Sequence, residues 1–291
     1  MSPNVRASLY MVLSMAGFTF NDVLVKSLDG ALSSTQVMGV RGACLSALIL
    51  LLLWQRGLLN RLGEAFTALV GMRASMELLA TFFFLSALTQ MSLASISAIL
   101  QALPLVVTFG AAILFREPVG WRRWLAIFIG FAGVMIIIRP GTDGFHPASI
   151  LMVVSVLFAA GRDLATRALP ASTPSLIVTA ATALLVTVAG FALTLANGTW
   201  VPVQGVQLGT LAMASVFLFF GYQFIILAMR TGDIAYVVPY RYTSLLWAVG
   251  LGYLVFDEMP DKWTIVGSMI VISMGLFTLY REVVRSRQAR L

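Results

Sequence analysis

The sequence is poor in charge, cysteine and histidine. Only 11% of its 291 residues are charged, whereas 59% are hydrophobic, and the mean hydropathy of +0.94 lies far outside the soluble range. Cys44 is the only cysteine, which excludes an intramolecular disulfide and a thiolate metal cluster. His146 is the only histidine, which removes most metal-site and histidine-based catalytic schemes. These shortages predict a helical membrane protein that is not an enzyme and holds no cofactor.

A regular alternation of polar and apolar residues is also missing, which disfavours a membrane β-barrel. The net charge of +7 would suggest nucleic-acid binding in a soluble protein. Here, however, the basic residues sit in short loops between apolar runs, where they set topology. We therefore expect the lipid bilayer as the surrounding partner and no nucleic acid.

Ten apolar segments have near the length of a membrane-spanning helix, about 20 residues at 1.5 Å each. The predicted spans are 6–28, 35–54, 67–89, 94–115, 121–138, 147–169, 175–196, 207–229, 234–256 and 262–280. The first is too long for the core of a signal peptide, and no convincing small-residue cleavage site follows it, so we expect it to be retained. The connections are too short to fold as separate domains.

Basic residues fall unequally on the two sides of these spans. With a cytoplasmic N-terminus, most of the lysines and arginines lie on the cytoplasmic side, and only Lys26, Arg139 and Lys262 lie on the other. The positive-inside rule therefore predicts a multi-pass protein of the plasma membrane with both termini in the cytoplasm.

The second half of the chain repeats the first at one fixed offset, which relates position 7 to position 148. Seven positions in segment 7–28 are identical to their partners in 148–169, and a weaker match relates 83–117 to 224–258. We expect two five-helix halves, residues 1–141 and 142–291. Because five is odd, the second half must enter the membrane from the opposite side. The expected fold is all-α, with ten transmembrane helices in an inverted repeat around a central cavity, as in alternating-access transporters.

The segment 232–258 is apolar enough to span the membrane, yet it carries Pro239 and Arg241 in its first half. A guanidinium in lipid costs from about 3 to well over 10 kcal/mol, so Arg241 is expected to face a wet cavity. Pro239 removes a backbone donor and predicts a bend. Pro104 weakens the span 94–115 in the same way, and both prolines are candidate gating residues.

The side chains predicted around Arg241 suit a small zwitterion such as an amino acid, because an arginine binds a carboxylate with two bonds and aromatic rings hold a side chain. Tyr236, Tyr240 and Trp247 form one stripe at helical spacing. An interfacial aromatic belt is the alternative for the tyrosines. Further candidates for substrate binding, from other predicted helices, are Glu77, Thr81, Gln101, Asn21, Tyr222 and Phe18.

Several of these candidates have a second interpretation. Glu77 lies four residues after Arg73, so an ion pair at the membrane boundary competes with substrate binding or proton exchange. For Tyr222 and Phe18, helix packing is the favoured role, and Gln101 acts only if it meets the cavity.

Two charge pairs occupy equivalent places in the repeat. Asp22 with Lys26 and Asp163 with Arg167 are each four residues apart and are predicted near opposite membrane faces. One interpretation is a pair of gates, one on each side. Boundary ion pairs with snorkelling side chains are the alternative.

These features together resemble the drug/metabolite transporter superfamily, and within it the ten-span EamA-type exporters of bacterial amino acids and metabolites. The resemblance rests on Asn21 and Lys26, Arg41, the run at 84–118 that contains Pro104 and ends near Glu117, and the matching run that ends at Glu258. It implies a secondary transporter of the bacterial inner membrane, with spans one, three, four, six, eight and nine around the cavity. Export is the implied direction.

Other functions fit the residues less well. A nucleotide-sugar or phosphate-ester exchanger would require several deep cations, and a multidrug exporter shares the fold. A membrane enzyme or a receptor explains neither the inverted repeat nor the buried polar groups. Protons are a candidate coupling ion because Glu77, Asp22 and Asp163 permit it. Gly130, Gly133, Gly267 and Gly275 are suited either to a dimer interface or to packing inside the bundle.

Overall fold

Every regular element in the described part of the chain is a helix. The computed structural model describes residues 2–28, 30–116, 120–170, 172–232 and 234–288. The elements are α1 (Pro3–Lys26), α2 (Ser34–Gln55), the 3₁₀ helix η1 (Leu59–Ala65), α3 (Ala68–Leu88), α4 (Leu93–Leu100), α5 (Leu103–Leu114), α6 (Trp121–Ile138), α7 (Ala148–Ala168), α8 (Ser175–Ala196), α9 (Gly205–Thr231), α10 (Ile234–Val237), the 3₁₀ helix η2 (Val238–Tyr242), α11 (Thr243–Phe256) and α12 (Lys262–Gln288). The predicted all-α fold is confirmed.

Within those ranges, nine helical segments are long and apolar enough to cross a membrane. The ninth predicted span, 234–256, is divided into α10, η2 and α11. Pro239 lies in η2, where the ring removes a backbone donor and the α-helix gives way to a 3₁₀ turn. The fourth span breaks in the same manner between α4 and α5, just before Pro104. The count of ten uninterrupted helices is therefore not confirmed, whereas both predicted bends are present.

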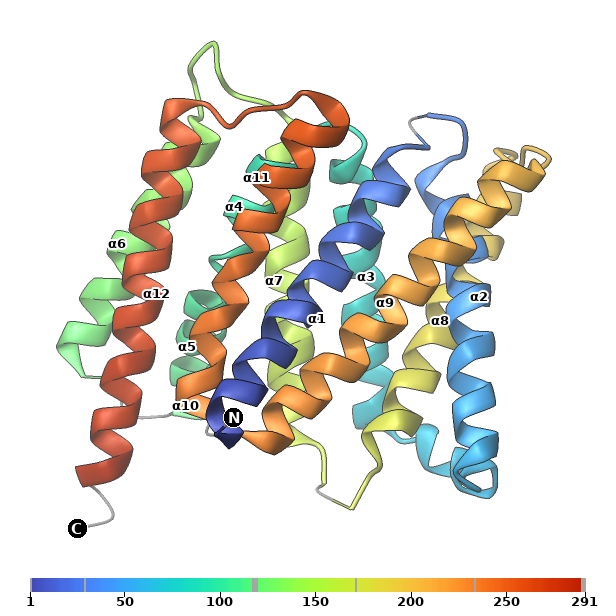
Figure 1. Cartoon of the computed structure of the whole chain (residues 1–291), viewed down its shortest axis with the longest axis horizontal. Coiled ribbons are helices and arrows are strands. Elements are labelled where there is room, and N and C mark those ends of the chain that lie inside the picture. Colours follow the sequence, from blue (N-terminus) through green and yellow to red (C-terminus); the bar gives the residue numbers. More distant parts are fainter. Residues whose placement is uncertain (1, 29, 117–119, 171, 233, 289–291) are drawn as a thin grey trace.

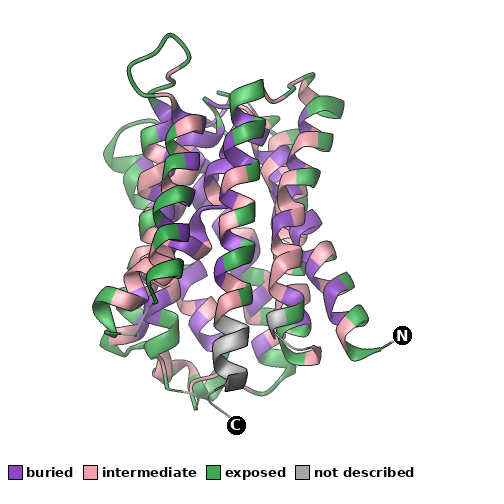
Figure 2. Cartoon of the chain, turned by 90° about the vertical axis from the view of Figure 1, so that its left-hand side faces the viewer, coloured by how far each residue is buried: buried purple, intermediate pink, exposed green. Residues whose placement is uncertain are grey.

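The outside of the bundle is covered with apolar side chains. Leu246 and Leu254 of α11 are 72% and 76% exposed, and Trp121 at the start of α6 is 70% exposed. Figure 2 shows exposed residues along the outward faces of the helices and buried residues between them. In water such a surface would be unfavourable, so it marks the face that contacts lipid.

Helix packing follows the inverted repeat. At the offset of the sequence repeat, α1 corresponds to α7 and α3 to α9, and the structure packs α1 against α9 and α7 against α3. In Figure 1, α1 begins at the lower end of the bundle, the end at which α12 also finishes, whereas α7 begins at the upper end. Ser46 of α2 and Thr187 of α8 are partners at this offset and share a hydrogen bond of 3.2 Å. The two halves thus run in opposite directions, while the boundary between positions 141 and 142 stays a prediction.

Glycine permits a close backbone contact between α2 and α8. A Cβ built on Gly190 would lie 2.7 Å from the Cα of Gly39 and 2.9 Å from the carbonyl oxygen of Thr35. Both neighbours are backbone atoms, so neither can move without separating the helices. The two helices approach here because neither glycine has a side chain.

We expect Gly190→Ala to lower the thermal unfolding midpoint of the purified protein by several degrees, because overpacking of this kind costs about 1–3 kcal/mol. Gly209→Ala in α9 is the matched control, since nothing lies within 4 Å of a Cβ at that position. There alanine should stabilise the helix by roughly 0.5–1 kcal/mol. Equal midpoints for the two variants would contradict the close contact.

The glycines that suggested either a dimer or bundle packing lie inside the bundle. Gly133 of α6 faces α12, where its Cβ would meet Ile270 and the carbonyl of Gly267. Gly130 lies against Leu105 and Met274, and Gly275 lies against Tyr242. In this chain these positions serve the packing of α6 and η2 on α12.

Candidate functional site

A cavity of about 600 Å³ lies between the two halves. This volume falls within the range of small-molecule sites. The cavity is lined by residues from α1, α2, α3, α4, α5, α7, α9, η2 and α11. The six predicted spans all contribute, and α2 adds Arg41.

The structure brings most of the candidate residues to this wall. Those that line the cavity are Phe18, Asn21, Asp22, Glu77, Thr81, Gln101, Pro104, Asp163, Tyr222 and Arg241. Phe18 and Tyr222 meet edge to face, with ring centroids 5.3 Å apart. They come from α1 and α9, so they pack these helices together and also present an aromatic surface to the cavity. Their part in substrate binding stays a prediction.

The remaining candidates lie outside the cavity wall; they are Tyr236, Tyr240, Trp247, Pro239, Lys26 and Arg167. The rings of Tyr236 and Tyr240 contact each other at a tilt of 41°, with centroids 6.1 Å apart, and Tyr236 is 45% exposed. Trp247 packs beside Phe20. Consecutive residues of a helix point in directions about 100–120° apart, so a stripe containing Tyr240 cannot share the direction of Arg241. The sequence pattern predicts an aromatic stripe beside Arg241 at the substrate. The structure corrects this prediction, because none of the three aromatic residues lines the cavity.

One arginine joins two acidic residues of the wall. The guanidinium of Arg162 donates from Nη1 to Glu77 at 2.9 Å and from Nε to Asp163 at 2.9 Å. The boundary pair of Arg73 with Glu77 is thus not formed. Arg73 donates instead to the hydroxyls of Thr166, at 3.0 Å, and Thr182. These bonds tie α3 to α7 and α8.

A second polar cluster occupies α1 and α2. The Asn21 amide donates to Asp22 Oδ1 at 2.8 Å, and its own oxygen accepts from Arg41 at 3.1 Å. Asn21 and Arg41 are both buried. Sequence reasoning did not identify Arg41 as a residue of the site, although its counterpart in the second half, Thr182, receives Arg73. The sequence did hold a signal for Arg41, because it and Thr182 are polar residues at equivalent positions of the two halves.

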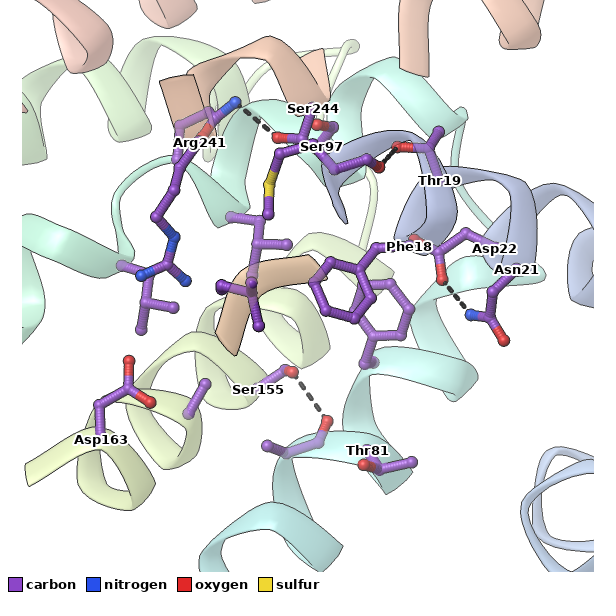
Figure 3. A pocket seen from close by; sticks show the side chains of 18 of the residues that line it. Phe18, Thr19, Asn21, Asp22, Thr81, Ser97, Ser155, Asp163, Arg241 and Ser244 are labelled. Atoms are coloured by element: carbon purple, nitrogen blue, oxygen red, sulfur yellow. Dashed lines mark hydrogen bonds between the residues drawn. The ribbon is translucent and has the colours of Figure 1, made fainter. Parts of the chain in front are cut away.

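Arg241 differs from these arginines in having no protein partner. Its guanidinium makes no hydrogen bond or ion pair with any residue that the structure describes, and it is half-buried. In Figure 3 it extends toward Asp163, which is already bound to Arg162. Asp163 and Arg241 interact electrostatically. A guanidinium left free in a cavity has its full set of donors available to a ligand.

The breaks in the fourth and ninth spans touch each other beside the cavity. Gln101, at the end of α4, donates to the carbonyl of Tyr242 at 3.3 Å and to the hydroxyl of Ser244 at 3.0 Å. Gln101 and Tyr242 are related by the offset of the repeat, so they are equivalent positions of the two halves. The Tyr242 hydroxyl is buried without a partner in the described structure.

An ion pair joins three helices at the end of the bundle away from the termini. Lys26 of α1 donates to Glu258, which follows α11, at 2.6 and 2.9 Å and to the carbonyl of Met91 at 2.7 Å. Glu258 also accepts from the backbone N–H of Leu93, at 3.1 Å, and Leu93 lines the cavity. The predicted pairing of Lys26 with Asp22 is therefore wrong. Lys26 pairs with Glu258 from another part of the chain and not with Asp22, one turn earlier in its own helix.

Arg167, the equivalent of Lys26 in the other half, also lies over an aromatic ring. Lys26 lies 5.1 Å from the centre of the Phe256 ring, and Arg167 lies 5.7 Å from that of Phe115. The predicted pair of Asp163 with Arg167 is not formed, since Asp163 binds Arg162. Glu117, the sequence counterpart of Glu258, lies outside the described residues.

A separate ion pair holds α6 to α12 at the same end as Lys26. Arg139 donates to Asp261, and neither residue lines the cavity. Burial alone raises the pKa of Asp261, but hydrogen bonds from Thr264 and the contact with Arg139 outweigh it and hold that pKa below its ordinary value. This pair fastens the bundle away from the cavity.

Comparison with known proteins agrees with this architecture. The model of the EamA-like transporter family matches residues 5–139 and again residues 146–280, so the two matches are related by the same offset as the sequence repeat. A solved structure with 16% sequence identity, described only as a crystal structure of a protein, superimposes with a TM-score of 0.68 over 96% of this chain and 98% of its own. It supports the fold alone.

Three curated relatives are transporters. An S-adenosylmethionine uptake transporter of Rickettsia felis is 25% identical over 94% of this chain and 92% of its own length. A riboflavin transporter of Rhizobium johnstonii is 31% identical over 66% of this chain and 63% of its own, and the pseudopaline exporter CntI of Pseudomonas aeruginosa is 25% identical over 89% and 91%. With a family model that covers both halves, this chain belongs to the EamA-like transporter family, within the drug/metabolite transporter superfamily, and is a multi-pass membrane transporter rather than an enzyme.

Proposed function

We propose that this protein is a secondary transporter of zwitterionic metabolites of the amino-acid type, which it moves across the bacterial inner membrane by alternating access. The observation that carries the proposal is the free guanidinium of Arg241 in the cavity wall. A carboxylate bound there receives two parallel charge-assisted bonds. Asp163 lies on the same side of the cavity and offers a negative charge to an adjacent ammonium group.

The relatives are named for different small metabolites, and the name of one of them agrees with a substrate of this class. One relative takes up S-adenosylmethionine, whose name contains an amino acid, one transports riboflavin and one exports pseudopaline. A cavity of about 600 Å³ has room for a metabolite larger than most free amino acids. The aromatic surface of Phe18 and Tyr222 suits a planar or apolar portion of such a molecule. Export remains the proposed direction, from the family resemblance.

A phosphate ester is the competing substrate class, because four arginines line the cavity: Arg41, Arg73, Arg162 and Arg241. Three of them are already bound to an amide, to hydroxyls or to carboxylates. Drawing them toward a phosphate would leave those buried partners unsatisfied, at about 1–3 kcal/mol each. One free cation suits a single carboxylate better than a dianionic phosphate.

The proposed orientation places both termini in the cytoplasm. The cavity extends toward their end of the bundle, since Arg73 lies in the second turn of α3 and Thr166 in the last turn of α7. The Lys26–Glu258 pair lies at the opposite end. The geometry thus supports a state that receives substrate from the cytoplasm.

Purified protein in liposomes should catalyse saturable flux of zwitterionic amino acids or their derivatives, measured with a radiolabelled panel. Unlabelled amino acids should compete for this flux, and sugar phosphates should not. A pH gradient applied in parallel tests proton coupling. Competition by sugar phosphates, with none by amino acids, would contradict the proposal and favour the phosphate-ester alternative.

A further inference from the structure

The charged residues of the cavity wall include one cation and one anion that form no hydrogen bond or ion pair with a described residue of opposite charge. Seven charged side chains line the cavity: Asp22, Arg41, Arg73, Glu77, Arg162, Asp163 and Arg241. Arg162 pairs with both Glu77 and Asp163, whereas Arg73 and Arg41 donate to hydroxyls and to an amide. Within the described structure, Arg241 makes no such bond, and Asp22 makes none to a cation.

The local geometry of Asp22 leaves half of its carboxylate available. Oδ1 accepts the amide of Asn21 at 2.8 Å, and Oδ2 has no hydrogen-bond donor among the described residues. Arg41 is near enough for its charge to act on Asp22, but its guanidinium binds the oxygen of Asn21 instead. Asn21 therefore holds the arginine one amide away and keeps the second carboxylate oxygen open to the cavity.

Asp22 and Arg241 lie on different sides of the cavity. Figure 3 shows Arg241 entering from one side and Asp22 from the other, with Phe18 between them. The charges that act on Arg241 include that of Asp163 and not that of Asp22. The carboxylate and ammonium of an α-amino acid are separated by a single carbon, so with the carboxylate on Arg241 we expect the ammonium to face Asp163 rather than Asp22. A ligand that satisfies both must carry a positive group at a distance from its carboxylate, with a body that passes Phe18.

We infer that Asp22 is a specificity-determining residue that binds a second positive group of the substrate, remote from its carboxylate. This inference rests on the proposed function, because the carboxylate of the same molecule occupies Arg241. The substrate class is narrowed to amino acids whose side chain ends in, or contains, a cation such as an ammonium or a sulfonium. A neutral side chain leaves Oδ2 of Asp22 without a bound cation or hydrogen-bond donor.

Two pairs of probes isolate this one charge. L-lysine and L-norleucine differ in a terminal ammonium group, and S-adenosylmethionine and S-adenosylhomocysteine differ in the charged sulfonium. We measure the affinity of the purified wild-type protein for each probe. In at least one pair, the charged member should bind at least about tenfold more tightly than the uncharged one, as expected for a hydrogen bond or ion pair to a charged group. In Asp22→Asn the ratio should fall close to one.

Two further variants keep the test interpretable. Asp143→Asn removes an exposed carboxylate in the connection between α6 and α7 and should leave the preference intact. Asp22→Glu retains the charge and should preserve part of the preference, which guards against a variant that merely fails to fold.

Three results would overturn the inference. Equal binding of both members by the wild-type protein would refute Asp22 selectivity and leave the proposed function standing. A preference that persists in Asp22→Asn would do the same and would assign the recognition of the cation to another carboxylate of the wall, Glu77 or Asp163. If the wild-type protein binds no amino acid or derivative at all, the proposed function is lost, and the role of Asp22 is lost with it.

Discussion

Arg241→Gln should reduce transport at least about 30-fold while the protein remains folded. Truncating one partner of a buried charge pair costs roughly 2–5 kcal/mol, and each 1.4 kcal/mol is a factor of ten. Because Arg241 has no protein partner in the described structure, its removal leaves no protein group unsatisfied. The effect should therefore appear in flux and in substrate binding, and not in the unfolding temperature.

Two control variants show whether the loss of transport is specific to the guanidinium of Arg241. Arg61→Gln removes an exposed arginine of η1 that pairs with Glu64, and it should transport normally because surface pairs contribute about 0–1 kcal/mol. Arg241→Lys keeps the charge but loses the two parallel donors, so we expect intermediate transport. Undiminished flux by Arg241→Gln in proteoliposomes would exclude this residue from the binding site.

The second large effect is expected at the Lys26–Glu258 pair, which we propose closes the cavity at the end away from the termini. Among the described residues, Lys26→Met leaves the Glu258 carboxylate with the Leu93 N–H alone, and it removes the ion pair between α1 and the end of α11. Lys26 and Glu258 are 11% and 29% exposed, so the loss should lie between that of surface and buried pairs, about 1–3 kcal/mol. The closed end should open about ten times more often.

A cysteine at position 93 reports this opening, because Leu93 lines the cavity beside the pair. In a Cys44→Ser, Leu93→Cys background, Lys26→Met should raise labelling by an impermeant thiol reagent added outside spheroplasts about tenfold. Arg139→Met breaks another ion pair at the same end, on helices that do not line the cavity, and should leave labelling unchanged. If both variants label alike, Lys26 has only a general stabilising role.

The course of the helices was predictable from the sequence, because apolar runs and the repeat specify it locally. Pro104 and Pro239 identified both breaks, since a missing backbone donor acts on its own helix wherever that helix lies. Arg241 was assignable to a wet cavity from the cost of placing its charge in lipid. These predictions needed no knowledge of which helices are neighbours.

The partners of the charged residues were not predictable in the same way. Spacing of four residues suggested Lys26 with Asp22, whereas packing brings Glu258 within 2.6 Å of the lysine. Likewise Arg162 of α7 pairs with Glu77 of the neighbouring helix α3. Such pairings depend on which helices pack together. The repeat did hold one clue, because it places a glutamate at equivalent positions of both halves, at 117 and 258.

The contact between Gln101 and Tyr242 has a consequence for the energetics of the cycle. If the two halves exchange conformations during transport, Tyr242 must take the place of Gln101. The phenol of a tyrosine cannot donate the two hydrogen bonds that the glutamine amide donates, and here it is turned toward Gly275. The inward and outward forms are then unequal in free energy without any ligand. We expect this transporter to rest predominantly on one side, with the cargo or an ion gradient supplying the bias for the return.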